Sequence, residues 1–197
     1  MIRDEGKEKT YQVNYSKLAE RLKSTSRETK HLIVRPYQDC DEDGLFELFH
    51  DENTMRMDGD KPILEKNEEF FRRINLIKEG SLIWFFAEKQ NSSDFVGYVM
   101  IQNEMDAVAL GFAITAAKQH KGYGYEMVKA VIDILFDSGV PEIRIKTWER
   151  KLPCQKMAER VGFERVNVIK DDHTDSVTGE ISDCYLYSLS NSRQVDK

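Results

Sequence analysis

The sequence predicts a single α/β domain, of the α+β type, with a mixed, mostly antiparallel and twisted sheet flanked by helices. Three observations lead to this fold class. The length of 197 residues suits one domain that buries a sizeable core. The apolar content of 40% is typical of globular proteins. The hydrophobic periodicity changes repeatedly along the chain and predicts the element order βααβββαβαββ.

Residues 1–30 are polar and are expected to form an N-terminal arm that lies outside the core. Leu18 and Leu22 stand four positions apart, a spacing that predicts one short helix within the arm. The folded domain is expected to span residues 31–190, and residues 191–197 are expected to form a tail.

One strand and two helices are predicted at the start of the domain. The apolar run Leu-Ile-Val makes 31–37 the first strand. Residues 43–49 and 64–77 carry apolar side chains at helical spacing, which predicts two amphipathic helices. The side chains that define the two apolar faces are Leu45, Phe46, Leu48, Phe49, Phe70, Phe71, Ile74 and Ile77.

The middle of the domain is predicted to contain three strands and a long helix. The first two strands flank the polar residues 90–94, a pattern typical of a β-hairpin. The helix should end near Gly139 and Pro141, because glycine suits the left-handed cap and proline cannot continue a helix. The three strands and the helix are placed at 82–88, 95–101, 107–114 and 125–136.

The end of the domain is predicted to be strand, helix and a closing pair of strands. Pro153 suits the first position of the helix and Gly162 suits its end. The closing strands are expected to enclose a polar loop at 170–180. The three strands and the helix are placed at 142–148, 153–160, 163–169 and 181–189.

Composition excludes several classes of protein. A net charge of −6 argues against a nucleic-acid partner, which would require a basic face. The three cysteines, Cys40, Cys154 and Cys184, form no CxxC pair and indicate neither a disulfide framework nor a metal site. The charged N-terminus lacks an apolar signal segment, and no apolar run approaches 18 residues. We therefore expect a cytoplasmic protein without a membrane partner or a bound metal.

A calcium-binding pattern begins at Asp39 but is not completed. Asp39, Asp41, Asp43 and Gly44 match the first half of an EF-hand loop. The twelfth position of that loop should be a bidentate glutamate, and it is His50. The preferred interpretation is that Asp41 or Asp43 caps a helix. A calcium-binding interaction protein is kept as a third hypothesis.

The most informative segment is 119–124, Gln-His-Lys-Gly-Tyr-Gly, between the strand at 107–114 and the helix at 125–136. A glycine-rich turn at a helix N-terminus presents N–H groups without intrahelical partners, and the helix dipole adds partial positive charge. Two glycines also let the backbone approach a bulky diphosphate. A dinucleotide-binding loop would need glycine at Met127, and a P-loop would need lysine at Tyr125. Both nucleotide-binding patterns are therefore excluded.

Gln119, Gly122 and Gly124 resemble instead the acyl-CoA signature, Arg/Gln-x-x-Gly-x-Gly/Ala, of the GNAT superfamily of N-acetyltransferases. The segment 151–163 is similar to that family's Asn-x-x-Ser, short helix and Gly-Phe. This form is typical of the RimJ/RimL-like branch, which acetylates ribosomal-protein N-termini. The opening and closing strands also look like those of that branch, so the resemblance covers about residues 31–190 and implies the GNAT fold.

The resemblance implies how acetyl-CoA binds as co-substrate. The pantetheine arm pairs with the strand before the signature, where the central strands splay near Gly111 and Gln119. A backbone N–H near Ala113 would stabilise the oxyanion of the tetrahedral intermediate. The family's asparagine, which commonly contacts the cofactor or orders catalysis, is Lys151 here. The cofactor-binding residues implied are Phe112, Ala113, Ile114, Thr115, Gln119, His120, Lys121, Gly122, Tyr123, Gly124 and Lys151.

The chain departs from the family at positions that transfer protons. The tyrosine that protonates the leaving thiolate falls at Ala158, and a glutamate common in this branch falls at Ala109. Cys154 occupies the serine position and could donate a proton; the alternative is a small buried apolar residue. A base is also needed, because an ammonium cannot attack. Glu104 and Asp106 are the nearest carboxylates in sequence; the alternative is that they are solvated turn residues.

Two functional hypotheses follow from the resemblance. The first is an N-acetyltransferase in which a primary amine, on a protein N-terminus or a small molecule, attacks acetyl-CoA directly within a ternary complex. The second is an acyl-CoA-binding module with weak or no catalysis. Asp58 and Asp60 could attract a cationic amine, and Trp84 and Trp148 are expected in the core. The chain is expected to be a monomer or a homodimer.

Overall fold

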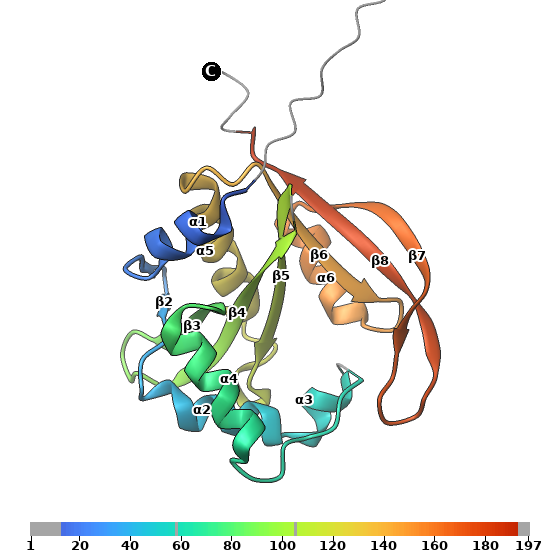
Figure 1. The fold of residues 1–197 in the computed structure, drawn as a ribbon, viewed down its shortest axis with the longest axis horizontal. Coiled ribbons are helices and arrows are strands. Elements are labelled where there is room, and N and C mark those ends of the chain that lie inside the picture. Colours follow the sequence, from blue (N-terminus) through green and yellow to red (C-terminus); the bar gives the residue numbers. More distant parts are fainter. Residues whose placement is uncertain (1–12, 58, 105, 193–197) are drawn as a thin grey trace, which may run out of the picture.

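The computed structural model describes residues 13–57, 59–104 and 106–192, which fold around one eight-stranded sheet (Figure 1). The strand order is β1-β2-β3-β4-β5-β6-β8-β7. Neighbouring strands are antiparallel except β5 and β6, which run parallel. This topology confirms the predicted mixed, mostly antiparallel sheet. The strands are β1 Arg27–Glu28, β2 Leu32–Pro36, β3 Ile83–Lys89, β4 Phe95–Glu104, β5 Ala107–Ile114, β6 Glu142–Trp148, β7 Glu164–Thr174 and β8 Ile181–Ser190.

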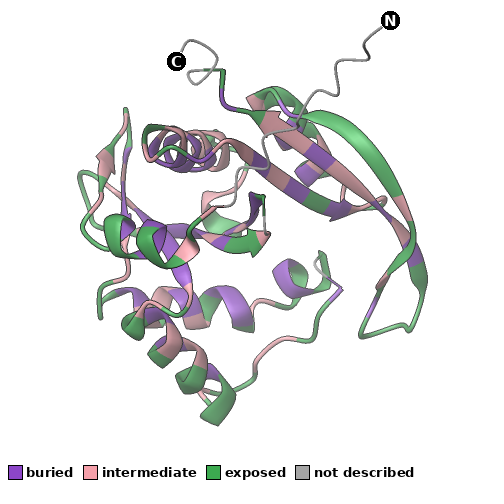
Figure 2. Cartoon of the chain, turned by 45° about the horizontal axis from the view of Figure 1, so that its top comes forward, coloured by how far each residue is buried: buried purple, intermediate pink, exposed green. Residues whose placement is uncertain are grey.

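Helices cover both faces of the sheet. One hydrophobic cluster joins α1, α5 and α6 to one face, and a second joins α2, α3 and α4 to the other. Figure 2 shows buried residues on the sides of the helices and strands that meet, whereas the edge strand β7 is mostly exposed. The helices are α1 Tyr15–Leu22, α2 Asp41–His50, α3 Glu52–Met57, α4 Glu68–Glu79, α5 Tyr123–Asp137 and α6 Leu152–Val161, with a 3₁₀ turn at Ala116–Lys118.

Local signals explain where several elements begin and end. Asn67 Oδ1 accepts a hydrogen bond from the N–H of Phe70 at 3.0 Å, so α4 begins at residue 68 rather than at the predicted residue 64. Gly80 and Gly162 end α4 and α6 in the left-handed conformation, with φ of 78° and 110°. The polar loop predicted at 170–180 is shorter than expected, because β7 continues through its first half. The sequence analysis missed α3 and β1, which are too short to show a period.

The described part of the N-terminal arm belongs to the core, which corrects the prediction that the arm lies outside it. Three apolar side chains of α1 are buried against α5 and the sheet: Leu18, Ala19 and Leu22. Tyr15 Oη also donates a hydrogen bond to the carbonyl oxygen of Ile101 in β4 at 2.7 Å. The sequence showed the apolar face of α1 but not the surface that it covers. The predictions for residues 1–12 and for the tail residues 193–197 lie outside the described residues.

Glu126, in the first turn of α5, anchors the end of the arm. Its carboxylate accepts hydrogen bonds from Thr29 Oγ1 at 2.5 Å and from the backbone N–H of His31 at 2.6 Å. It also pairs with Nδ1 of His31 at 2.8 Å. Burial raises the pKa of Glu126, but these hydrogen bonds outweigh it, so the pKa lies below its usual value. The charged form of Glu126 therefore stabilises the fold.

We expect Glu126→Gln to lower the free energy of unfolding by about 1–2 kcal/mol at pH 7, because the amide cannot accept all of these bonds. A carboxyl whose folded pKa is depressed contributes stability above its unfolded pKa, about 4.3, and loses that contribution as pH falls through the folded value. The difference should therefore shrink below pH 4. Urea unfolding from pH 3 to 8 measures it, with the exposed Glu20→Gln as control. Equal stability at pH 7, or a difference that persists at pH 3, would contradict the expectation.

The sheet opens between its two parallel strands. β5 and β6 are in register only at Val108 with Ile143 and at Ala109 with Arg144. Beyond Ala109 the edge of β5 that faces β6 has no strand partner among the described residues, while its other edge stays paired with β4 through residue 114. Figure 1 shows β5 and β6 diverging from this point. The splay predicted near Gly111 is therefore present.

Candidate active site

A groove of about 320 Å³ lies where β5, the 119–124 loop, α3 and α6 meet, and we name it the signature groove. It lies at the end of β5 that the divergence of β6 leaves open. Seven of the residues predicted to bind the cofactor line it: Phe112, Ala113, Ile114, Gln119, His120, Gly124 and Lys151. The loop and the strand edge that were separate signals in the sequence therefore form one surface.

The other four predicted cofactor-binding residues lie beside the signature groove without lining it. The N–H of Thr115 bonds to a carbonyl oxygen of β4 at 3.0 Å, so it is used within the sheet. Lys121 Nζ donates to the carbonyl oxygen of Ala117 at 2.8 Å. Gly122 is the N-cap of α5, with φ of 84°, and Tyr123 is the first helical residue. The helix thus begins two residues earlier than predicted, because glycine adopts the left-handed conformation that starts it.

A larger cavity of about 540 Å³, the central cleft, lies between the two diverging halves of the sheet and is bordered by α3, α4 and β7. Its aromatic wall consists of Phe49, Trp84, Tyr98, Phe112 and Trp148. Its ionisable side chains are Asp60, Arg73, Lys146, Lys151, Cys154, Asp172, His173 and Cys184. Phe112 and Lys151 line both this cleft and the signature groove, so the two cavities meet between them.

The segment that follows α3 contacts the β7–β8 hairpin at one side of the central cleft. The carbonyl oxygen of Gly59 accepts hydrogen bonds from the N–H and the Oγ of Ser176, both at 2.7 Å. Trp148 Nε1 donates to the carbonyl oxygen of Met57 at 3.2 Å, and the ring of His173 lies 4.5 Å from the ring of Trp148. Trp148 is therefore a half-buried wall residue rather than the expected core residue, whereas Trp84 is buried as expected.

Cys154 and Lys151 lie together at the start of α6. Cys154 is 8% exposed and lines the central cleft. Burial raises the pKa of the Cys154 thiol, and the nearby Lys151 opposes this. Burial lowers the pKa of the Lys151 ammonium, because a charged group is disfavoured in a poorly hydrated site. Two titratable groups that influence each other electrostatically thus line the central cleft, and Lys151 also lines the signature groove.

Glu104 and Asp106, the predicted bases, occupy the other end of β5. Arg144 Nη1 lies 3.4 Å from a Glu104 oxygen and 3.1 Å from an Asp106 oxygen. Hydrogen bonding from Arg144 lowers the pKa of Asp106. Neither carboxylate is among the residues that line the signature groove or the central cleft. The geometry therefore places both with a structural ion pair and apart from the cavity junction.

Sequence reasoning missed several polar residues of the central cleft. Asp172 and His173 were assigned to a loop because 170–174 is polar, yet they lie on β7 and face the cleft. Asp60, predicted to attract an amine, does line the cleft, whereas Asp58 is outside the described residues. The signal that could have found Asp172 and His173 is the short polar run between two strands of a closing hairpin.

The three aspartates of the incomplete calcium pattern pair with three different cations. Asp41 is buried and pairs with Arg35 at 2.8 Å. Asp39 pairs with Lys78 at 2.8 Å, and Asp43 pairs with Lys66 at 2.6 Å. Asp41 also accepts the N–H of Gln38, a residue before the helix, so the prediction that Asp41 or Asp43 caps α2 is wrong. The N-cap is Cys40, which makes no side-chain capping bond.

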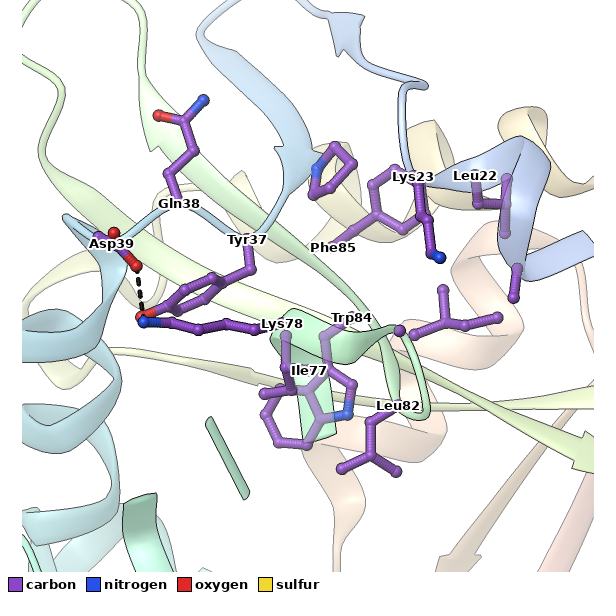
Figure 3. Close-up of a pocket in the computed structure, with 14 residues that line it drawn as sticks. Leu22, Lys23, Tyr37, Gln38, Asp39, Ile77, Lys78, Leu82, Trp84 and Phe85 are labelled. Atoms are coloured by element: carbon purple, nitrogen blue, oxygen red, sulfur yellow. Dashed lines mark ion pairs between the residues drawn. The ribbon is translucent and has the colours of Figure 1, made fainter. Parts of the chain in front are cut away.

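A third cavity of about 520 Å³, the outer cavity, lies between α1, the β2–α2 connection and the end of α4. Figure 3 shows Tyr37, Lys78 and Asp39 on one side of it and Leu22 on the other. The outer cavity shares Trp84 with the central cleft but contains no residue of the 119–124 loop. It is therefore separate from the surface that the signature forms.

The opened parallel strand pair and the glycine-rich start of α5 together define an acyltransferase-type domain. A protein-family model described as an acetyltransferase (GNAT) domain matches residues 31–164, more than half of the chain. The chain therefore belongs to the GNAT acetyltransferase family, as the signature indicated. The match begins at the predicted first strand and includes the whole signature groove.

Solved structures share the fold at low sequence identity. A GNAT-family acetyltransferase from Bacillus anthracis has a TM-score of 0.72 and 18% identity, covering 85% of this chain and 99% of its own. The ribosomal-protein-S5-alanine acetyltransferase from Vibrio fischeri has a TM-score of 0.69 and 21% identity, and the match covers 86% of this chain and 98% of that one. The spermidine N-acetyltransferase from Vibrio cholerae, in complex with CoA and spermine, has a TM-score of 0.71 and 15% identity. The match covers 83% of this chain and 98% of that one.

No curated protein matched the chain in sequence. None of the described helices combines the length and the apolar character that crossing a bilayer requires. Among residues 13–57, 59–104 and 106–192, no three histidine, cysteine, aspartate or glutamate side chains gather as a metal-ion site would need.

Proposed function

We propose that the chain transfers an acetyl group from acetyl-CoA to a primary amine by direct attack within a ternary complex. The observation that carries this proposal is the junction of two cavities of different character. The signature groove is lined by Gln119 and Gly124 of the acyl-CoA signature, and the central cleft has an aromatic and charged wall. A donor in one cavity and an acceptor in the other would meet between Phe112 and Lys151.

The signature groove suits acetyl-CoA in shape and charge. The pantetheine arm would lie along residues 112–114 of β5, on the edge that faces away from β4. This edge has no strand partner among the described residues. The diphosphate would rest near Gly122 and Gly124, where the first N–H groups of α5 point outward. Lys118 lines the same groove and would add positive charge, and its Nζ also pairs with Asp94 at 2.7 Å. Because the N–H of Thr115 faces β4, that of Ala113 does as well, and the neighbouring N–H groups of Phe112 and Ile114 would face the thioester oxygen.

The central cleft suits an amine that carries an apolar neighbour. Phe49, Trp84 and Tyr98 give it a broad aromatic wall, and Asp60 supplies a carboxylate that would attract an ammonium. Two of the similar solved structures are named as a ribosomal-protein-S5-alanine acetyltransferase and a spermidine N-acetyltransferase. The acceptor proposed here is a primary amine of either class.

A module that binds acyl-CoA without fast transfer is the second candidate. Two positions that carry proton-transferring side chains in relatives hold Ala109 and Ala158 here. Ala158 lies on α6 and is fully buried, and Ala109 lies on β5 and is 6% exposed. This observation favours slow turnover but leaves acyl-CoA binding intact.

Calorimetry and a thiol-release assay test the two candidates. Acetyl-CoA should bind to the purified chain at micromolar to millimolar concentration, and no heat at millimolar acetyl-CoA would refute both. The assay should be run with peptides that carry free N-termini, with polyamines and with aminoglycosides. Thiol release that depends on one of these amines supports the transferase. Binding without amine-dependent release from any of them supports the module.

A further inference from the structure

The proton path is the unsolved part of the proposed reaction. When an amine attacks a thioester, a proton must leave the nitrogen, and the departing sulfur gains one. The alanines at 109 and 158 cannot carry it. Glu104 and Asp106 pair with Arg144 and do not line either cavity. The carrier must therefore be sought at the junction of the signature groove and the central cleft.

Two residues line both cavities, Phe112 and Lys151, and only Lys151 ionises. Its backbone is fixed as the N-cap of α6. Its N–H bonds to the carbonyl oxygen of Trp148 at 3.1 Å, and its own carbonyl oxygen accepts the N–H of Cys154 at 3.0 Å. From this point Lys151 borders both the signature groove and the central cleft, between which donor and acceptor would meet.

We propose that the Lys151 amine carries the proton from the attacking nitrogen to the sulfur of CoA. This inference rests on the proposed function. The neutral acceptor amine forms the C–N bond and gives a zwitterionic tetrahedral intermediate. Neutral Nζ of Lys151 takes one proton from that nitrogen, the C–S bond breaks with its electron pair on sulfur, and Nζ returns the proton to the thiolate. The products are the N-acetyl amine and CoA thiol, and Lys151 is regenerated.

The surroundings of Lys151 suit this role better than those of Cys154. Free lysine has a pKa of about 10.4 and a thiol about 8.5. Burial lowers the pKa of Lys151, toward that of the CoA thiol, and raises the pKa of Cys154, away from it. The N-terminus of α6 also disfavours a cation at its cap. Proton exchange is fastest between groups of similar pKa, so Lys151 is the better partner for the CoA thiolate.

Other titratable groups face the junction and must be separated from Lys151 in a pH profile. The titratable residues that line the central cleft with Lys151 are Cys154 on α6, Lys146 on β6, Tyr98 on β4, Cys184 on β8, and Asp172 and His173 on β7. Asp60 and Arg73 approach from the side of α3 and α4, and Lys118 and His120 lie in the signature groove. Only a limb of the profile that disappears with the Lys151 side chain can be assigned to it.

The test compares Lys151→Met, Lys151→Gln and Lys151→Arg with the wild-type chain, and uses Lys156→Met, exposed on the same helix, as the matched control. We expect kcat to fall about 10²- to 10⁴-fold in all three Lys151 variants. The Kd for acetyl-CoA should stay within about threefold in at least one of them, and Lys156→Met should match the wild type. The wild-type kcat should rise with pH to a plateau, and this limb should be absent from Lys151→Gln. Arginine should not rescue, because it stays charged.

Three results would overturn the inference. One is a wild-type kcat in Lys151→Met or Lys151→Gln. Another is full rescue by Lys151→Arg, which would assign Lys151 a purely electrostatic role. The third is stoichiometric acetylation of Lys151 itself, seen as its mass increase after incubation with acetyl-CoA, because the amine would then be a nucleophile. An active wild type with unaffected variants refutes this inference alone, whereas a wild type that releases no thiol with any amine refutes the proposed function as well.

Discussion

Arg35→Met should lower the free energy of unfolding by about 3–5 kcal/mol, the cost of leaving a buried ion pair without one partner. Arg35 lies on β2 and is 6% exposed. Its two terminal nitrogens bind both carboxylate oxygens of Asp41, at 2.8 and 3.0 Å, and one of them also lies 2.8 Å from Glu88. One guanidinium therefore joins β2, the start of α2 and β3.

The expected loss arises from the carboxylates rather than from the arginine. Asp41 is 2% exposed, and without Arg35 its carboxylate would lose both guanidinium bonds and keep the bond from the Gln38 N–H at 2.7 Å. A charge in such a place costs several kcal/mol unless it is paired or protonated. Replacing all three side chains by apolar ones of similar volume removes the stranded charges. The triple variant Arg35→Met, Asp41→Leu, Glu88→Met should therefore recover most of the loss.

Urea unfolding at pH 7 measures this effect, with Arg72→Met as the matched control. Arg72 also makes an arginine–glutamate pair, with Glu69 at 2.8 Å, but its side chain is 60% exposed. Exposed pairs contribute about 0–1 kcal/mol, so the control should differ little from the wild type. Equal losses in Arg35→Met and Arg72→Met would show that burial of the Arg35 cluster has no energetic consequence.

The helices and strands with a clear period could be predicted from the sequence, and those without one could not. The apolar spacing in α5 follows from its burial on one broad face, so it was visible in the chain. The stripe of Leu18 and Leu22 was equally visible, but most of the core residues that it joins, on β3, β4, β5 and α5, lie more than 60 positions further along the chain. Only the tertiary fold shows that this stripe is covered. The end of β7 carries polar residues on an exposed edge strand, so no hydrophobic pattern marks it.

The residues of the candidate site also divide into those that the sequence could predict and those that it could not. The 119–124 loop was predictable because a helix N-terminus and its glycines are local features. Asp60 and His173 come from segments more than 100 residues apart, and each alone is an ordinary polar residue. The ion pairs of Glu104 and Asp106 with Arg144 were also invisible, because proximity to β5 in sequence did not reveal the partner on β6. Local chemistry thus led to the proposed donor site, whereas the proposed acceptor site required the fold.

Gly124→Glu should abolish measurable acetyl-CoA binding while leaving the fold intact. Gly124 lines the signature groove in the first turn of α5. A Cβ at this position would lie 3.5 Å from Ile114 Cγ1 and 3.8 Å from Met157 Cε, which are ordinary contacts. The rest of a glutamate side chain would then occupy the groove and bring a carboxylate to the diphosphate. Like charges in such contact cost several kcal/mol, which corresponds to a loss of about a hundredfold or more in affinity.

Two variants separate the charge from other effects. Gly124→Ala adds only the Cβ, so acetyl-CoA should bind within about tenfold of the wild type, and the fold should gain up to about 1 kcal/mol of stability from the lost flexibility of glycine. Ser26→Glu makes the same change in net charge at an exposed residue before β1 and should bind acetyl-CoA normally. Calorimetry gives the three dissociation constants, and urea unfolding confirms that each variant is folded. Wild-type affinity in a folded Gly124→Glu variant would place the diphosphate elsewhere and remove the 119–124 loop from the donor site.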